Sequence, residues 1–207
     1  MSGIAAAACI IGSYLLGAVP TSYLVARGIA GIDLREHGSR NLGATNLYRV
    51  LGWRYAIPVG LFDVAKGAIP VAVFAPLVSS STVFAVACGI AAVVGHVFSI
   101  FVRFRGGKGV ATAAGVVLGL TPLALAIAFI VWAAIVWLTG YVSLGSIVGA
   151  VLLPAAVLLF HPGERGLVWF YAGIAAFVVW AHRANIRRLV SGTENRFGRR
   201  AAAGRAS

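Results

Sequence analysis

Long runs of apolar residues dominate this sequence and alternate with short polar stretches. The runs cover about residues 4–26, 55–78, 83–102, 110–138, 144–160 and 167–182. A helix that crosses a bilayer needs roughly 20 apolar residues, so each run predicts at least one membrane-spanning helix. The pattern therefore predicts an all-α integral membrane protein, organised as a single polytopic membrane domain over residues 1–207.

The run at 110–138 is longer than one crossing requires, and it contains Thr121 and Pro122 near its middle. One helix over this run would extend roughly 44 Å at 1.5 Å per residue. The hydrocarbon core of a bilayer measures only about 30 Å. Either one long, tilted helix or two short helices that meet near Pro122 would fit this length.

The distribution of positive charge distinguishes these alternatives. The tail from Arg183 onward carries seven arginines against one glutamate, and the polar stretch at 27–54 carries five arginines against two acids. Cytoplasmic segments are enriched in such cations, which places both segments in the cytoplasm. When the crossings are counted along the chain, these two segments lie on the same side of the membrane only if the run at 110–138 crosses it twice. This predicts seven transmembrane helices, with the N-terminus outside and the C-terminus cytoplasmic. The basic tail at about 195–207 is expected to be flexible.

The composition excludes several function classes. The chain is 60% hydrophobic and only 11% charged, and its net charge of +12 lies in loops and the tail. The positive-inside rule explains most of these cations, so we expect anionic lipids and substrates as partners and no nucleic acid. Cys9 and Cys88 lie in apolar runs, and the histidines and acids are scattered. We therefore expect no metal site and no cofactor.

One pair of charges lies inside a predicted span. Asp63 and Lys66 are three residues apart, so a helix would place them on one face. Ionisable groups within a membrane span are costly and are usually paired or functional. We expect a mutual ion pair with a structural role.

Under the seven-helix topology, four polar clusters share the cytoplasmic side. They are residues 37–49, 95–112, 140–146 and 182–194. The second cluster contains Gly106, Gly107, Lys108 and Gly109, preceded by two arginines. Glycine lets the backbone approach a ligand closely, and cations at a glycine-rich turn are typical of phosphate binding. A plain membrane loop with cations on its cytoplasmic side is the alternative.

Familiar catalytic signatures are missing. The stretch at 103–109 lacks the glycine spacing and the preceding strand of a nucleotide-binding P-loop. No histidine is followed five positions later by aspartate, the spacing used by acyltransferases with a His–Asp general base. A reaction in which the substrate's own phosphate accepts the proton would suit such a site. So would a transporter or flippase of an anionic solute or lipid, although we find no internal repeat.

Three motifs together resemble one enzyme family. They are Gly38-Ser39-x-Asn41-x-Gly-Ala-Thr-Asn46, then Gly95-His96-x-Phe-Ser-x-Phe with Arg105-Gly-Gly-Lys-Gly-Val-Ala-Thr112, and His182-x-x-Asn185-Ile-x-Arg188-Leu with Gly192-Thr-Glu194. In this order they resemble bacterial acyl-phosphate:glycerol-3-phosphate acyltransferase, the PlsY family. That family has seven membrane helices and makes lysophosphatidic acid and inorganic phosphate for phospholipid synthesis. It transfers a fatty acyl group from acyl phosphate to the 1-hydroxyl of sn-glycerol 3-phosphate.

The resemblance implies a role for individual residues of this sequence. The implied catalytic residues are Ser39, Arg49, His182 and Asn185. The implied substrate-binding residues are Asn41, Thr45, Asn46, His96, Arg105, Gly106, Gly107, Lys108, Gly109, Ser143, Ser146 and Arg188. Glu194 is expected to be structural. Gly145 departs from the family, which has serine there, so Ser143 and Ser146 remain alternatives for the third loop.

The resemblance also implies a location and partners. We expect a multi-pass protein of the bacterial cytoplasmic (inner) membrane whose active site faces the cytoplasm. Acyl phosphate and glycerol 3-phosphate are the expected substrates, and the lipid bilayer is the surrounding partner. The soluble enzyme that forms acyl phosphate is a further candidate partner. We expect no covalent acyl-enzyme, and either a phosphate oxygen or His182 takes the proton.

Overall fold

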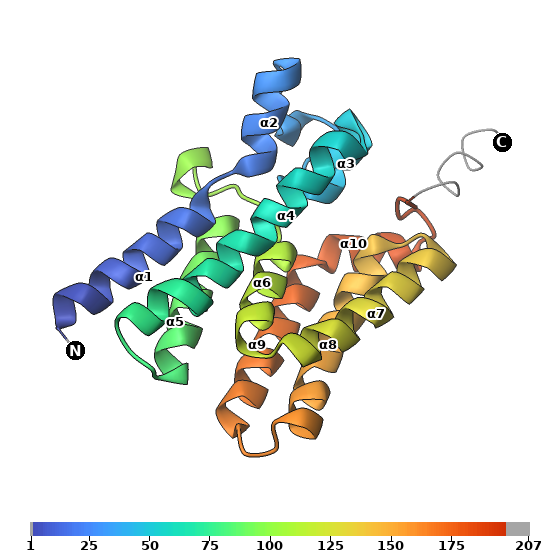
Figure 1. Ribbon diagram of the computed structural model, residues 1–207. Coiled ribbons are helices and arrows are strands. Elements are labelled where there is room, and N and C mark those ends of the chain that lie inside the picture. Colours follow the sequence, from blue (N-terminus) through green and yellow to red (C-terminus); the bar gives the residue numbers. More distant parts are fainter. Residues whose placement is uncertain (1, 198–207) are drawn as a thin grey trace. The chain divides into compact units, whose positions relative to one another are not determined.

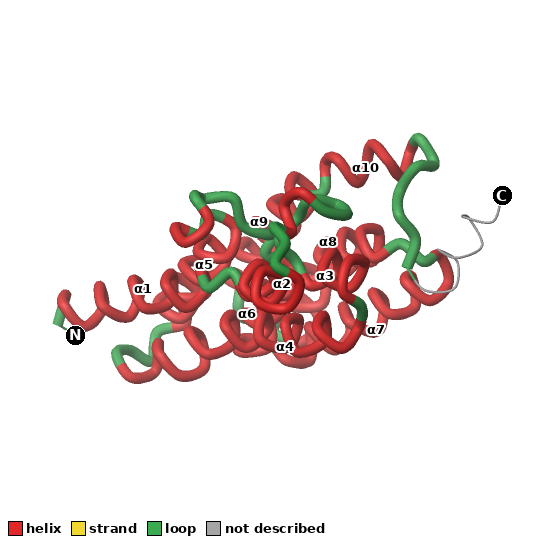
Figure 2. The backbone as a smooth tube through the Cα atoms, turned by 90° about the horizontal axis from the view of Figure 1, so that it is seen from above, coloured by secondary structure: helices red, strands yellow, loops and turns green. Residues whose placement is uncertain are grey.

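The computed structural model describes residues 2–197, and every regular element within that range is a helix (Figures 1 and 2). The chain divides into two compact units, one ending at Leu120 and the other starting at Thr121. The first unit contains α1 (Gly3–Ala18), α2 (Thr21–Ala30), α3 (Ala44–Leu51), α4 (Trp53–Ile69), α5 (Thr82–Val97) and α6 (Val110–Leu120). The second contains α7 (Pro122–Thr139), α8 (Val142–Phe160), α9 (Arg165–Ala181) and α10 (Arg183–Val190). The single-domain organisation stays a prediction, and most of the predicted flexible tail lies outside the described residues.

The prediction of an all-helical integral membrane protein is confirmed. Among residues 2–197, five helical segments are long and apolar enough to cross a membrane. They are Gly3–Ala30, Trp53–Leu77, Thr82–Val102, Pro122–Thr139 and Val142–Phe160. A sixth forms if α9 and α10, which bend by 59° at their junction, count as one span. Helix α6 has only 11 residues, about 16 Å of helix, so the count of seven and the topology stay predictions.

The first apolar run is broken, where one continuous helix over 4–26 was expected. Helix α1 ends at Ala18, and α2 starts at Thr21 and continues to Ala30. The break lies at Pro20, since proline has no N–H to donate and its ring clashes with the preceding turn. The carbonyl oxygen of Val19 instead accepts a hydrogen bond from the Thr21 N–H at 3.0 Å.

The long run at 110–138 is divided into two helices. Helix α6 ends at Leu120, Thr121 adopts an extended φ of −146°, and α7 starts at Pro122. Proline is favoured at the first position of a helix because the missing N–H would have no partner there. This confirms the alternative in which two helices meet near Pro122.

Small residues let the helices of the first unit pack closely. Helix α1 packs on α5, and α4 packs on α6. A Cβ atom at Gly17 would collide with the carbonyl oxygen of Ala92, and one at Gly67 would collide with that of Thr112. These positions require glycine because the two backbones touch.

Helix α8 is the centre of the second unit and packs on both α7 and α9. Gly145 lies against Trp132 of α7, where an added Cβ would come within 3.0 Å of the Trp132 carbonyl oxygen. This contact accounts for glycine at a position where the family resemblance predicts serine. The Thr121 and Tyr171 hydroxyls form a buried hydrogen bond of 2.7 Å.

The contact of α4 with α6 can be tested by adding one methyl group. We expect Gly67→Ala to destabilise the folded protein by about 1–3 kcal/mol, because overpacking forces backbone shifts. The measurement is thermal or denaturant unfolding of purified protein in detergent. Gly173→Ala is the matched control, since nothing lies within 4 Å of a Cβ at this position in α9. Equal stability of the two variants would contradict the close packing.

Candidate active site

The loop between α2 and α3 is organised around the buried side chain of Asn46. Its Nδ2 group donates to the carbonyl oxygens of Leu34, His37 and Asn41 at 3.3, 3.0 and 3.0 Å. Its Oδ1 accepts the N–H of Ser39 at 2.7 Å. Asn46 was expected to bind substrate, but its donors are used within the loop. Its role in this structure is therefore to shape the loop.

This shaping leaves other residues of the first motif accessible. Ser39 is exposed, while its backbone is fixed by Asn46. Gly38 has a φ of 59°, and a Cβ there would collide with Asn46 Oδ1. Thr45 and Arg49 are four residues apart on α3 and share a face, and both are half-buried. Asn41 is also half-buried, at the end of the loop.

A small apolar core anchors this loop to the membrane helices. Its buried members are Ala26, Leu34, Leu42, Leu47, Val59 and Val102. They come from α2, the loop, α3, α4 and the turn after α5. Because α3 and α6 both pack on α4, that helix supports Arg49 and the glycine-rich loop alike.

The glycine-rich loop folds back onto the end of α5. The N–H of Gly106 donates to the Val97 carbonyl at 3.0 Å, and that of Gly107 donates to the His96 carbonyl at 3.1 Å. A Cβ at Gly106 would collide with the His96 carbonyl oxygen, and one at Gly107 would collide with the His96 ring. Both N–H groups are therefore bonded within the protein, and substrate binding by Gly106 and Gly107 stays a prediction. These two glycines allow close backbone contact.

The end of the glycine-rich loop leads into α6. Gly109 has a φ of 76°, which favours glycine, and α6 starts at Val110. The first N–H groups of a helix have no partner within the helix, and such helix starts bind phosphate groups. Lys108 lies two residues before the first residue of α6. His96, predicted to bind substrate, is only 7% exposed and lies beneath Gly107, so it supports the loop from below.

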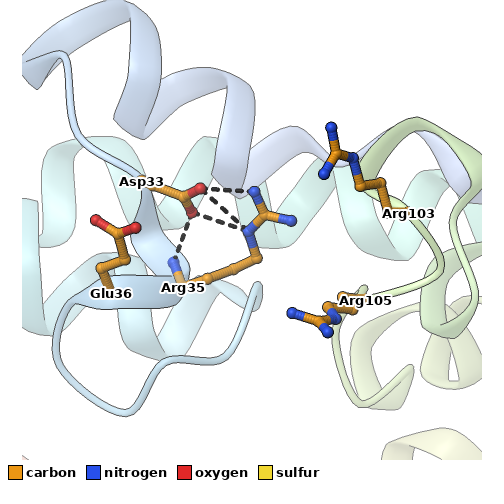
Figure 3. A pocket seen from close by; sticks show the side chains of 5 residues that line it. All are labelled: Asp33, Arg35, Glu36, Arg103 and Arg105. Atoms are coloured by element: carbon orange, nitrogen blue, oxygen red, sulfur yellow. Dashed lines mark hydrogen bonds and ion pairs between the residues drawn. The ribbon is translucent and has the colours of Figure 1, made fainter.

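A polar pocket of about 430 Å³ lies between the loop after α2 and the loop after α5 (Figure 3). It is lined by Asp33, Arg35, Glu36, Arg103 and Arg105. Arg35 Nη2 is 2.6 Å from Asp33 Oδ2, and Nε contacts both carboxylate oxygens. Hydrogen bonds from Arg35 lower the pKa of Asp33 to about 2, although partial burial opposes this shift.

Of these five residues, Arg103 and Arg105 were expected beside the glycine-rich turn, and Arg105 was expected to bind substrate. Arg35 Nη1 donates to the Val102 carbonyl at 3.4 Å and so joins the two loops. The sequence signal for Asp33, Arg35 and Glu36 is the group of charges at 33–36, shortly after the glycine that ends α2.

In the second unit, Glu194 gathers the polar residues of α8 and α10. Its Oε1 accepts hydrogen bonds from Ser143 Oγ at 2.9 Å and Asn185 Nδ2 at 2.6 Å. Its Oε2 accepts one from Arg188 Nε at 2.7 Å. Burial alone would raise the pKa of Glu194, but these three hydrogen bonds together lower it below its ordinary value. The carboxylate thus joins three side chains, and its structural role stays a prediction.

The two serines of the third cluster differ in their contacts. Ser143 is bonded to Glu194, whereas Ser146 Oγ donates to the Val142 carbonyl of its own helix at 2.9 Å. A serine that bonds the preceding helical turn contributes little to a neighbouring cluster. Ser143 is therefore the serine that belongs with Asn185 and Arg188.

His182 lies at the bend between α9 and α10 and is only 3% exposed. Its Nδ1 is 2.8 Å from the Val178 carbonyl oxygen, so this nitrogen carries the proton and donates. In the neutral imidazole, Nε2 is then the acceptor. The Nδ1 nitrogen is thus oriented by a backbone carbonyl, whereas a His–Asp dyad would orient it by a carboxylate.

The comparisons with known proteins agree on one family. A family model described as "Glycerol-3-phosphate acyltransferase" matches residues 7–192. A protein of that name from Geotalea daltonii is 48% identical, with 92% of this chain and 96% of the relative covered. One from Halalkalibacterium halodurans is 46% identical, with 92% and 95% covered.

Two solved structures are similar throughout this chain. Both are crystal structures of PlsY (YgiH), an integral membrane glycerol 3-phosphate acyltransferase. Its glycerol 3-phosphate form has a TM-score of 0.86 and 36% identity, with 93% of this chain and 96% of that one covered. Its lysophosphatidic acid form has a TM-score of 0.81 at the same identity, with 93% and 95% covered.

The Glu194 cluster should make stability depend on pH. A lowered folded-state pKa stabilises the protein above the unfolded-state value of about 4.3, and the benefit disappears as pH falls through the folded-state pKa. We expect Glu194→Gln to unfold at a lower temperature than the parent protein at pH 7, with the difference shrinking as the pH falls below about 4. The measurement is thermal unfolding in detergent from pH 7 to well below pH 4. A pH-independent difference would argue against the ionised cluster.

Proposed function

The chain belongs to the glycerol-3-phosphate acyltransferase family, and on that premise we propose that its acyl donor is acyl phosphate and its chemistry is substrate-assisted. The protein is a multi-pass integral membrane enzyme that makes lysophosphatidic acid from glycerol 3-phosphate. The observation that carries the proposal is the His182 hydrogen bond to the Val178 carbonyl. With no carboxylate on Nδ1, a donor that is already activated and brings its own proton acceptor suits the site best.

The reaction balances without a cofactor or an acyl-enzyme. The 1-hydroxyl oxygen of glycerol 3-phosphate attacks the acyl carbon, and a new ester C–O bond forms. The bond between the acyl carbon and the phosphate oxygen breaks. The hydroxyl proton passes to an oxygen of the phosphate, which leaves as inorganic phosphate. The enzyme accelerates this exchange by positioning the reactants and stabilising negative charge.

In the first unit, we assign phosphate binding to Lys108 and the start of α6. The first-turn N–H groups from Gly109 onward and the Lys108 ammonium would hold the phosphate of glycerol 3-phosphate. Arg49 on α3 would contribute a second cation, with Thr45 on the same face. Ser39 and Asn41 would donate to the glycerol hydroxyls, on a loop held by Asn46.

In the second unit, we assign hydrogen bonding to the reacting groups to His182 and Asn185. His182 Nε2 would orient the attacking hydroxyl, without removing its proton in a separate step. Asn185, Ser143 and Arg188 are held by Glu194, which fixes their side chains before substrate binds.

The membrane topology is part of the proposal. We place seven crossings with α6 as the short one, the N-terminus outside, and the active site facing the cytoplasm of a bacterial inner membrane. The arginine-rich segments support this orientation. On that side the enzyme can receive acyl phosphate from the soluble enzyme that forms it.

The leading test is phosphate release. Purified protein given acyl phosphate and glycerol 3-phosphate should release inorganic phosphate in equal amount to the lysophosphatidic acid formed. Acyl transfer from acyl-CoA at an equal rate would contradict the assigned donor. Glycerol 3-phosphate counterflow in proteoliposomes without ester formation would instead favour the transporter alternative.

A second test asks which group accepts the proton of the attacking hydroxyl. If a phosphate oxygen accepts it, His182→Ala should lower kcat by less than about 100-fold, below the usual range for loss of a general base. The pH profile of kcat should keep its shape. His161→Ala is the control, because His161 lies at the other end of α8 from Ser143. A larger loss together with a vanished acidic limb in the profile would assign the base to His182.

A further inference from the structure

Two charged side chains of α4 are buried among apolar helices and take no part in the assigned chemistry. Asp63 is 2% exposed and Lys66 is 1% exposed, and Lys66 Nζ lies 2.7 Å from Asp63 Oδ1. The expected ion pair is therefore confirmed. Burying two charges is costly even when they pair, and an apolar pair of similar volume is often at least as stable. Stability alone is a weak explanation for this pair.

The pair is bonded to the break between α1 and α2. Lys66 Nζ donates to the Val19 carbonyl at 2.9 Å, next to the proline that interrupts the helix. The Thr21 hydroxyl lies 3.5 Å from Asp63 Oδ1. Both charges are thus held at a fixed point between α4 and the first broken span.

The third neighbour of the pair is His96, the residue beneath the glycine-rich loop. Its Nδ1 lies 3.9 Å from Asp63 Oδ1 and is buried without a hydrogen-bond partner among the described residues. Its carbonyl accepts the Gly107 N–H, and its Nε2 lies where a Gly107 Cβ would be. One edge of the imidazole thus faces the ion pair, and the other edge supports the loop.

The same turn of α4 also contacts the far end of the loop. Gly67, next to Lys66, touches the backbone of Thr112 in the first turn of α6, and Val64 touches Gly115. Residues 63–67 of α4 therefore reach the loop through α5 on one side and α6 on the other. Displacing this turn would move both ends of the segment that carries Lys108.

We propose that Asp63 and Lys66 are positioning residues for phosphate binding. Acting through His96, they hold Gly106 and Gly107 against α5, and so fix Lys108 and the start of α6 around the phosphate of glycerol 3-phosphate. The pair does not touch substrate. This inference rests on the proposed function of the Lys108 loop.

The test replaces the pair by two double variants that leave no unpaired charge. Asp63→Leu/Lys66→Met fills the space with apolar atoms. Asp63→Asn/Lys66→Gln keeps a donor and an acceptor without charge. Tyr171→Phe is the matched control, since it removes a buried hydrogen bond from a membrane helix of the other unit. For each, KM and kcat are measured with both substrates, together with thermal unfolding with and without glycerol 3-phosphate.

We expect the apolar variant to raise KM for glycerol 3-phosphate about tenfold, with kcat and KM for acyl phosphate within about twofold. The polar variant should recover most of this loss. Tyr171→Phe should lower the unfolding temperature and leave every KM unchanged. An unchanged KM for glycerol 3-phosphate in a folded double variant would overturn the proposal.

A further variant tests the route through His96. The triple variant Asp63→Asn/Lys66→Gln/His96→Gln should raise KM for glycerol 3-phosphate no more than His96→Gln alone. The reason is that substitutions acting through one contact do not have additive effects. Additive effects would overturn this route, even if the apolar variant does not fold. Turnover of the parent protein is read in the same experiment. Suppose that the parent protein shows no turnover, but glycerol 3-phosphate raises the unfolding temperature of the parent and not that of the variants. The proposed acyl transfer is then wrong, while the positioning role of Asp63 and Lys66 stands.

Discussion

Every backbone polar group within a bilayer must find its partner inside the protein, because lipid tails offer none. This constraint is most visible where proline interrupts the first span. The break at Pro20 leaves the Val19 carbonyl to accept the Thr21 N–H and the buried Lys66 ammonium. Lys66 in turn requires Asp63, and Asp63 lies beside His96 under the loop that carries Lys108. One broken helix is therefore connected through buried polar contacts to the segment assigned to phosphate.

The polar groups around Asn46 and those around Glu194 are each held together by one buried side chain. Asn46 joins three carbonyls and one N–H in the first unit, and Glu194 joins a serine, an asparagine and an arginine in the second. Asn46 thus fixes the backbone of the loop, and Glu194 restricts the rotamers of its neighbours, before substrate arrives. Both effects lower the entropy lost on binding. A polar residue in a site motif can therefore serve the reaction without touching a reactant.

The sequence does not predict which polar residues of a motif touch a reactant and which only support the site. Apolar length and charge were sufficient for the helical class, the break at Pro122 and the Asp63–Lys66 pair, because these depend on local composition and spacing. The break at Pro20 was missed, since a proline near the end of a span does not reveal where the chain resumes its helix. The roles of Asn46, His96, Gly106 and Gly107 depend on which backbone atoms lie opposite them. Tertiary contacts decide this, and neither motif nor periodicity encodes it.

Three of the five acids of this chain are neutralised by a nearby cation, which limits their repulsion of a phosphate. Among the described residues, Asp33, Asp63 and Glu194 each form an ion pair with a cation two, three or six residues away. The partners are Arg35, Lys66 and Arg188. A bare carboxylate near the site would oppose the binding of a dianion, whereas a carboxylate neutralised by a close neighbour contributes little field at a distance. Local pairing therefore lets these three acids organise loops and helix breaks, while the excess of 17 basic over 5 acidic residues keeps the chain attractive to anionic substrates.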